Sequence, residues 1–353
     1  MKRALVFTFV IGVFLLLYGT LVWFVLSELA KLFGVWSSVI LVVSTFFLTI
    51  SFPIVTVFER KLPAGRLLYV ISAIIMGLVF IAFVVLLCQR FISIFFEMPK
   101  AVWRWLVVMT TIMLTITALF CGNTIAIKKI SIVSKKIRKP LRVVHISDLH
   151  IGSIRRDHYV AKVVREIQQL RPDVVVITGD LFDGPGKYDV ATLKRFDTIG
   201  VPVLFSVGNH DLFLGDQTMR LLLAKTKIIS LRQRNFSFGG VQFLGIDDEN
   251  IAAEVAKKRD LLPKTNDFTV LLYHRPSAWQ AVRNVDLQLS GHTHAGQIFP
   301  FTLLVWLFER PVMGLHRRKD GRIYVSPGTG TWGPPMRLGS RNTITVITLS
   351  EHV

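Results

Sequence analysis

Cysteine is scarce in this chain, which has only two cysteines, Cys88 and Cys121, among its 353 residues. Both lie in apolar stretches, so we interpret them as packing residues and not as a disulfide or a metal-binding thiolate pair. This interpretation excludes a disulfide-stapled scaffold and a cysteine-based metal site. The sequence also contains no internal repeat and no low-complexity tract.

Acidic residues are also scarce, above all in the first part of the chain. Residues 1–140 contain 15 Lys+Arg and only 3 Asp+Glu, whereas residues 141–353 contain 27 and 20. The net charge of +19 therefore divides into about +12 and about +7. Because most of the basic excess lies in an apolar region, it does not indicate a nucleic-acid-binding surface.

The first part of the chain instead contains long apolar runs. Four stretches without Lys, Arg, Asp or Glu are long enough to cross a bilayer. They are Ala4–Leu26, Val35–Phe58, Leu67–Cys88 and Leu106–Ala126. A signal peptide does not explain the first stretch, because its apolar run is too long and no small-residue cleavage site follows. The sequence predicts a four-helix transmembrane region over residues 1–127.

The basic residues between these spans predict their orientation. The connections on one side carry 12 Lys+Arg, including those of Glu59–Arg66 and Lys128–Arg142, and the connections on the other side carry 4. The positive-inside rule places the first side in the cytoplasm. We therefore expect a multi-pass membrane protein with residues 141–353 on the cytoplasmic side. Residues 128–140 are predicted to form a polybasic linker, which either binds anionic headgroups or simply flanks the last span.

From Leu141 onward the pattern changes to alternating strands and helices. A helix with apolar spacing is predicted over Asp157–Leu170. Strands are predicted over Leu141–Ser147, Asp173–Thr178, Pro202–Val207, Asn235–Phe238, Val241–Ile246, Phe268–Tyr273, Asp286–Leu289, Arg322–Val325 and Thr343–Leu349. This many strands, some parallel and some in hairpins, predicts an α/β fold in which two sheets form a sandwich flanked by helices over residues 141–353.

Five short polar motifs follow predicted strands in this second part. They are Asp148-Leu149-His150, Gly179-Asp180, Gly208-Asn209-His210-Asp211, His274 and Gly291-His292-Thr293-His294. Ligands at strand ends converge on one edge of a sheet. Carboxylates, an amide and imidazoles suit hard or borderline divalent cations. Each motif alone is common in ordinary turns, but their joint occurrence predicts a two-metal site.

The spacing within the motifs indicates which residues can bind the same ion. Asp148 and His150 lie two residues apart, so both can hold one ion from the same side of the chain. A strand–helix–strand connection makes the next strand a parallel neighbour, which brings Asp180 beside Asp148, where its carboxylate can bridge two ions. His292 and His294 can each face a different ion.

These motifs resemble the calcineurin-like metallophosphoesterase family over residues 141–353. Ala295-Gly296-Gln297 and the later segment 330–337 are similar to the membrane-tethered YkuE/YaeI-like branch. The resemblance implies that the chain holds two metals and that His210 is an acid or a phosphate contact oriented by Asp211. It assigns the first metal to Asp148, His150, Asp180 and His294, and the second to Asp180, Asn209, His274 and His292.

The resemblance implies hydrolysis of a phosphodiester or a pyrophosphate bond. Two cations would lower the pKa of a bridging water, giving a hydroxide that attacks phosphorus, and would clamp the phosphoryl oxygens. Nitrogen and oxygen ligands suit Mn, Fe, Zn or Co, and the family's frequent use of Mn makes Mn the first expectation. Some of four nearby arginines are expected to bind phosphate oxygens. These candidates are Arg155, Arg156, Arg275 and Arg337.

The apolar segment Ile298–Phe308 bears on the substrate. It is too short to span a bilayer, and two interpretations remain: a buried helix of the domain core, or a helix that dips into the membrane beside the site. The second interpretation would suit a lipid-linked phosphoester such as UDP-diacylglucosamine of lipid A biosynthesis, by family analogy. A phosphodiesterase for soluble nucleotides and a non-catalytic membrane receptor built on this scaffold are the alternatives, and no nucleic-acid partner is expected.

Overall fold

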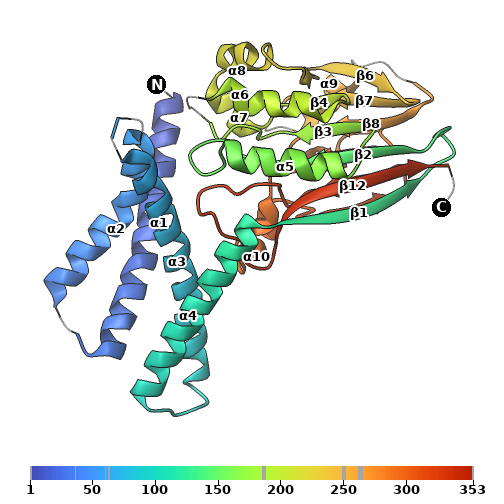
Figure 1. The fold of residues 1–353 in the computed structure, drawn as a ribbon. Helices are drawn as coiled ribbons and strands as arrows, with labels where there is room; N and C mark the ends of the chain where they lie inside the picture. Colours follow the sequence, from blue (N-terminus) through green and yellow to red (C-terminus); the bar gives the residue numbers. More distant parts are fainter. Residues whose placement is uncertain are drawn as a thin grey trace. The chain divides into compact units, whose positions relative to one another are not determined.

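The computed structural model describes residues 2–35, 37–59, 61–62, 64–184, 188–248, 252–260 and 265–351. The chain divides into two compact units, shown in Figure 1. The first contains Met1–Phe120 and Gly333–Met336, and the second contains Cys121–Trp332 and Arg337–Val353.

The first unit consists mainly of four helices that are long and apolar enough to cross a membrane, as the sequence predicts. They are α1 (Lys2–Phe33), α2 (Ser38–Phe58), α3 (Gly65–Ile92) and α4 (Lys100–Asn123). Apolar side chains cover most of their surfaces, and in α2 only Thr49 is buried among the described residues. Helices that are apolar all round are typical of a lipid environment.

Aromatic and polar contacts join these helices. Phe24 of α1 meets Phe83 of α3 edge to face, with ring centroids 5.3 Å apart. The Arg104 guanidinium of α4 donates to the Leu32 carbonyl of α1 at 3.1 Å. Both contacts link segments far apart in sequence, so they fix how the helices associate within this unit.

The second unit contains two six-stranded sheets. The first sheet has the order β1-β12-β2-β3-β4-β5, with β1 (Ile125–Val133), β2 (Leu141–Ile146), β3 (Val174–Thr178), β4 (Val203–Ser206), β5 (Ile229–Ser230) and β12 (Asn342–Ser350). The second has the order β10-β11-β9-β8-β7-β6, with β6 (Arg234–Phe238), β7 (Val241–Gly245), β8 (Phe268–Leu272), β9 (Leu287–Ser290), β10 (Gly314–Arg318) and β11 (Gly321–Val325). The central strands β2–β5 run parallel, as do β11, β9, β8 and β7. The fold is the two-sheet α/β sandwich that the sequence predicts.

Alternation along each strand divides its residues between two cores. Val174 and Val176 of β3 point into the layer between the sheets, together with Phe243 and Leu272 of the second sheet. Val175, between them, packs on the outer face of the first sheet. Because both faces of the parallel strands are buried, these strands are continuous apolar runs without polar alternation.

Helices cover the outer faces of the sheets. α5 (Asp157–Gln169) buries the stripe formed by Val160, Val163, Val164 and Ile167 against the first sheet, and Figure 1 shows it lying along that face. The other helices of this unit are α6 (Val190–Lys194), η1 (Arg195–Ile199), α7 (Asn209–Leu214), α8 (Asp216–Leu223), α9 (Ala252–Asp260), η2 (Pro276–Gln280), η3 (His294–Gly296) and α10 (Phe301–Phe308). Most of them connect consecutive strands, which leaves the strand ends free to present side chains.

The prediction of a linker over residues 128–140 is wrong for its first half. The last predicted span, which ends at Ala126, is also three residues too long. α4 ends at Asn123, and Ile125–Val133 forms β1, paired in parallel with β12. Ile130 and Ile132 face the layer between the sheets. The alternation of these isoleucines with polar neighbours is therefore that of a strand, and Lys128 and Lys129 lie on its exposed part.

Candidate metal centre

The loops that follow β2 and β3 run side by side. The Asp148 N–H donates to the Gly179 carbonyl and the His150 N–H to the Asp180 carbonyl, each at 3.0 Å. These bonds continue the parallel pairing of the two strands by a few residues beyond their ends. The two carboxylate motifs are thus placed next to each other, as the strand–helix–strand reasoning predicts.

The loops after β8 and β9 make the corresponding pair in the second sheet. The Gly291 N–H donates to the His274 carbonyl at 2.9 Å. The His292 N–H donates to Asp148 Oδ1 at 2.9 Å, which joins this pair of loops to the loop after β2. Four of the five motifs therefore meet at one end of the sandwich, and the His210 N–H, which donates to Asp180 Oδ1, brings the fifth there too.

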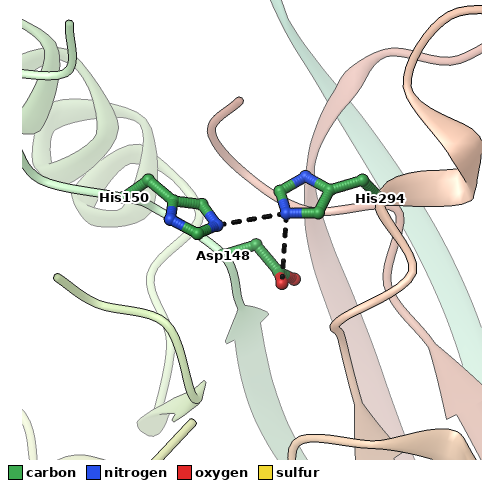
Figure 2. Close-up of side chains that lie close together, drawn as sticks. All are labelled: Asp148, His150 and His294. Carbon is green, nitrogen blue, oxygen red and sulfur yellow. Dashed lines mark hydrogen bonds and ion pairs between the residues drawn. The ribbon is translucent and has the colours of Figure 1, made fainter. Parts of the chain in front are cut away.

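Figure 2 shows the first cluster of candidate ligands, Asp148, His150 and His294. His150 Nε2 lies 3.1 Å from His294 Nε2, which lies 3.6 Å from Asp148 Oδ1. The Asp183 carboxylate accepts from His150 Nδ1 at 3.1 Å, so in the neutral ring the lone pair of His150 is on Nε2 and points into the cluster. An oriented imidazole of this kind is the usual form of a metal-binding histidine.

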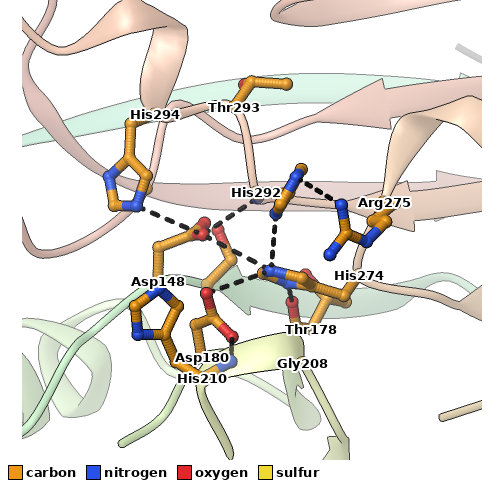
Figure 3. Close-up of polar contacts among 12 residues, drawn as sticks. Asp148, Thr178, Asp180, Gly208, His210, His274, Arg275, His292, Thr293 and His294 are labelled. Atoms are coloured by element: carbon orange, nitrogen blue, oxygen red, sulfur yellow. Dashed lines mark hydrogen bonds and ion pairs between the residues drawn. The ribbon is translucent and has the colours of Figure 1, made fainter. Parts of the chain in front are cut away.

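Figure 3 shows the second cluster, Asp180, His274 and His292. His274 Nε2 lies 3.1 Å from Asp180 Oδ2 and 3.3 Å from His292 Nδ1. The Thr178 carbonyl can only accept, and it lies 2.8 Å from His274 Nδ1, so the neutral ring carries its proton there and its lone pair on Nε2. The two sheets thus contribute to this cluster together.

Asp180 belongs to the second cluster, and together with His150 and His210 it forms a third group of candidate ligands that links the second cluster to the first. Its Oδ2 is 3.1 Å from His274 Nε2 and 3.8 Å from His150 Nε2. Burial opposes the charge of the Asp180 carboxyl, but the neighbouring histidines His274, His150 and His210 together outweigh burial and lower its pKa. Burial likewise disfavours the charged His274 ring, but Asp180 raises the pKa of His274 to about 10. The carboxylates thus stabilise positive charge at this position. They would stabilise a bound divalent cation in the same way.

Two buried oxygen atoms that lack hydrogen-bond donors in the described part of the chain indicate that these residues fit metal ions. Among the described residues, Asp148 Oδ2 and Asn209 Oδ1 have no hydrogen-bond donor, although both atoms are buried. A buried acceptor without a partner is costly unless a cation or a water satisfies it. Together with the paired imidazole nitrogens, these oxygens form a nitrogen-and-oxygen ligand set that fits divalent ions.

The backbone at the site is unusual. Five candidate ligands adopt positive φ, an uncommon conformation for residues other than glycine. They are Asp148 (50°), His150 (48°), Asp180 (52°), His292 (73°) and His294 (49°). Backbone strain of this kind collects at functional sites, where the surrounding structure maintains it.

The glycines of the motifs are required by close packing against the ligands. A Cβ atom on Gly208 would lie 2.2 Å from Asp180 Oδ1, and one on Gly291 would lie 2.3 Å from Asp148 Oδ2. Gly179 has a φ of +82°, and its Cβ would lie 2.4 Å from His274 Nδ1. Any side chain at these positions would displace a candidate ligand.

His210 lies in the group of candidate ligands that links the two clusters, and Asp211 does not orient it. The His210 N–H donates to Asp180 Oδ1 at 2.9 Å, and its Nδ1 is 3.4 Å from the Asp183 carbonyl. The buried Asp211 carboxylate instead accepts from the backbone N–H groups of Asp180, Phe182 and Gly208 at 2.8–2.9 Å. The predicted contact between Asp211 and His210 is therefore wrong, because backbone donors occupy the carboxylate. Asp211 holds together the loops that follow β3 and β4.

Two of the four arginines predicted to bind substrate are buried and serve as internal supports. Arg155, 2% exposed, donates to the Gly122 carbonyl and to Thr331 Oγ1. Arg337, 0% exposed, donates to the His294 carbonyl at 3.0 Å, to the Gly330 carbonyl and to Asn342 Oδ1. For these two the prediction is wrong, because their guanidinium groups are enclosed by acceptors of the chain itself.

The other two arginines have different positions. Arg275 is partly exposed next to a candidate ligand, with its Nε 2.9 Å from the Asp248 carboxylate and its NH1 3.0 Å from His292 Nε2. Arg156 is exposed at the N-cap of α5. Phosphate binding by these two arginines stays a prediction.

Four residues near the site were not predicted. Asp183 contacts His150, and Asp248 binds Arg275. Glu309 Oε1 lies 3.8 Å from His292 Nε2, and the exposed Trp332 ring meets the His210 ring with centroids 5.6 Å apart. Asp183 carries a sequence signal, since it follows Asp180 closely, and Trp332 lies in the segment 330–337 that resembles the family. The fold alone brings Asp248 and Glu309 to the site.

The comparisons with known proteins agree with this geometry. Residues 141–296 match the model of the calcineurin-like phosphoesterase family. A metallophosphoesterase of Aquifex aeolicus, described as uncharacterized, is 31% identical over 242 residues, which cover 63% of this chain and 91% of the relative. A counterpart in Helicobacter pylori is 33% identical over 243 residues and 63% of each chain. A transmembrane protein with metallophosphoesterase domain from Danio rerio is 33% identical over 60% of this chain and 53% of its own length.

The chain belongs to the calcineurin-like metallophosphoesterase family, as the motifs predict. It spans somewhat under two thirds of the length of the first curated relatives that it matches. Members of the family normally bind two divalent metals, and the two clusters offer the ligands for them.

Proposed function

We propose that this protein is a membrane-anchored, metal-dependent phosphoesterase that hydrolyses a phosphodiester or a pyrophosphate bond. One observation carries the proposal: two clusters of buried carboxylates and imidazoles meet at Asp180. In this proposal Asp148, His150, Asp180 and His294 hold one ion. Asp180, Asn209, His274 and His292 hold the other.

Bound divalent ions would supply an activated water and neutralise phosphoryl oxygens. His210 lies beside the clusters with its backbone N–H fixed on Asp180, so its ring is placed to donate to a phosphate oxygen or to the leaving group. Asp211 keeps the loops of Asp180 and Gly208 together and acts as a positioning residue. Arg275 is the better placed of the two remaining arginines for binding a further phosphate oxygen.

The substrate in this proposal has an apolar part. Two exposed aromatic side chains flank His210, namely Phe213 (61% exposed) and Trp332 (53% exposed), with ring centroids 5.4 and 5.6 Å from its ring. Exposed aromatic residues beside a polar site favour an amphiphilic ligand. A lipid-linked pyrophosphate such as UDP-diacylglucosamine is the finer proposal, with the site on the cytoplasmic side of a bacterial inner membrane and Mn as the first metal to test.

Purification in detergent with Mn²⁺ tests the proposal. The protein is assayed on phosphomonoesters, phosphodiesters, free nucleotide pyrophosphates and UDP-linked lipids, with Asp180→Asn as the matched inactive control. We expect hydrolysis of diesters or pyrophosphates by the parent protein and not by the variant. Hydrolysis of soluble nucleotides but not of lipids would support a nucleotide phosphodiesterase, and no metal-dependent turnover of any substrate would contradict an enzymatic role.

A further inference from the structure

The helix α10 is the most exposed apolar element of the second unit. Its eight residues, Phe301-Thr302-Leu303-Leu304-Val305-Trp306-Leu307-Phe308, contain no charge, and none of them is buried. Leu303 and Leu307 are each 60% exposed, and Phe308 is 79% exposed. The interpretation of this segment as a buried core helix is therefore wrong for the described structure. Contiguous apolar exposure of this kind marks an interaction surface.

Four of the exposed side chains lie next to one another on the helix surface. Leu303 and Leu307 are four residues apart, as are Leu304 and Phe308, so the two pairs lie next to each other along the axis. Eight residues extend only about 12 Å, whereas the hydrocarbon core of a bilayer is about 30 Å thick. The helix can therefore lie within one membrane interface but cannot span the membrane.

The C-terminal end of α10 suits a headgroup layer. The Arg310 guanidinium stacks on the Trp306 ring at 3.6 Å from its centroid, and its Nε donates to the Trp306 carbonyl at 2.8 Å. Both side chains are exposed. A tryptophan paired with a cation at the edge of an apolar helix is typical of segments at the boundary between acyl chains and anionic headgroups.

Hydrogen bonds within the second unit connect α10 to the end of a membrane helix. The Gly122 carbonyl, one residue before α4 ends, accepts from Asn342 Nδ2 at 2.6 Å. Asn342 Oδ1 accepts from Arg337, and Arg337 donates to the His294 carbonyl. Thr302 of α10 donates to the Ala295 carbonyl at 2.8 Å. These bonds join α10, within the second unit, to Gly122, and the apolar helix that is long enough to cross a membrane ends at Asn123, one residue later in the chain.

We propose that α10 lies in the interfacial layer of the bilayer, with Leu303, Leu307 and Phe308 toward the acyl chains. This face would anchor the metallophosphoesterase domain independently of the four spanning helices. It would also place the loop of His292 and His294 at the membrane surface, because α10 follows that loop directly. The proposal concerns lipid contact alone, so it stands or falls separately from the proposed hydrolysis.

Site-directed fluorescence in lipid vesicles tests this placement. Cys88→Ser and Cys121→Ser remove the native thiols, and Leu307→Cys receives an environment-sensitive nitrobenzoxadiazole label. The full chain is reconstituted in vesicles of phosphatidylethanolamine and phosphatidylglycerol, with or without phosphatidylcholine that carries a nitroxide on its acyl chain. Gln217→Cys on the exposed face of α8 is the matched control. A label at Phe308→Cys repeats the measurement with a different side chain removed.

We expect the labels at 307 and 308 to emit at the shorter wavelengths of an apolar medium. We also expect the nitroxide lipid to quench them several-fold more than the label at 217. Emission as in water, without quenching by the lipid, would overturn the proposal. Short-wavelength emission without lipid quenching would also overturn it, because the helix would then be covered by protein, either its own spanning helices or a second copy of the chain.

Discussion

Replacing Asp180 by asparagine removes one charge at the point where the two clusters meet and leaves the shape of the side chain nearly unchanged. Its oxygen can still accept the His210 N–H, which lies 2.9 Å from Oδ1. A pair of unit charges 4 Å apart interacts by about 4 kcal/mol at an effective dielectric constant of about 20. That energy corresponds to a loss of about 10³-fold in affinity for each ion that the carboxylate contacts. We therefore expect Asp180→Asn to lose both metals and its activity.

The same variant has a pH signature in metal-free protein. Asp180 raises the pKa of His274 to about 10, above its ordinary value of 6.5. The stability from this pair is therefore fully present between pH 3.8, the ordinary pKa of the carboxyl, and pH 6.5, and it is lost as pH rises through about 10. Breaking a buried ion pair costs about 3–5 kcal/mol, so in the presence of chelator Asp180→Asn should unfold at lower temperature than the parent at neutral pH. The difference should shrink toward pH 10.

Metal content by mass spectrometry and thermal unfolding in detergent measure these effects. Asp183→Ala is a graded control: it removes the carboxylate that accepts from His150 Nδ1 and should cost about 10–100-fold in metal affinity. Asp173→Asn changes an exposed carboxylate that accepts from the Arg142 N–H, and it should leave metal content unchanged. Two tightly bound metals in Asp180→Asn, or a pH-independent stability difference, would refute the reasoning.

Three further predictions concern other parts of the chain. His210→Ala should keep its metals and lower kcat by about 10² or more, with a smaller loss on p-nitrophenyl diesters than on substrates with poor leaving groups; a lost metal would instead make His210 a ligand. Gly291→Ala should place a methyl group 2.3 Å from the present position of Asp148 Oδ2, which costs about 1–3 kcal/mol of stability and lowers metal content; full metal content would contradict the role of Asp148. A fluorescent protein fused after the last residue should be bright and alkaline phosphatase there inactive, because the basic connections divide 12 to 4; the reverse would place the site outside the cytoplasm.

The strands and the metal centre were predictable because the signals for both are local. A fully buried strand is a short apolar run, so β3 and β8 appear in the sequence within one residue of their observed bounds. The candidate ligands directly follow such runs, and parallel pairing brings them together without any further information. The positive φ angles of Asp148 and Asp180 could not be foreseen, because the loops impose them only after the sheets have formed.

Elements whose role depends on distant partners were predicted poorly. The lysines of β1 obscured its strand pattern, and only its pairing with β12, more than two hundred residues later, establishes it as a strand. Arg155 and Arg337 follow or lie near motifs and carry the charge expected of phosphate ligands. Their burial against Gly122, Asn342 and the loop of His294 depends on packing that no local pattern encodes.

Anomalous diffraction from crystals of Mn²⁺-loaded protein tests the central claim most directly. We expect two Mn peaks about 3.5–4 Å apart. One should be bound by Asp148, His150 and His294 and the other by Asn209, His274 and His292, with Asp180 contacting both. A single peak, or peaks away from these residues, would contradict a two-metal centre.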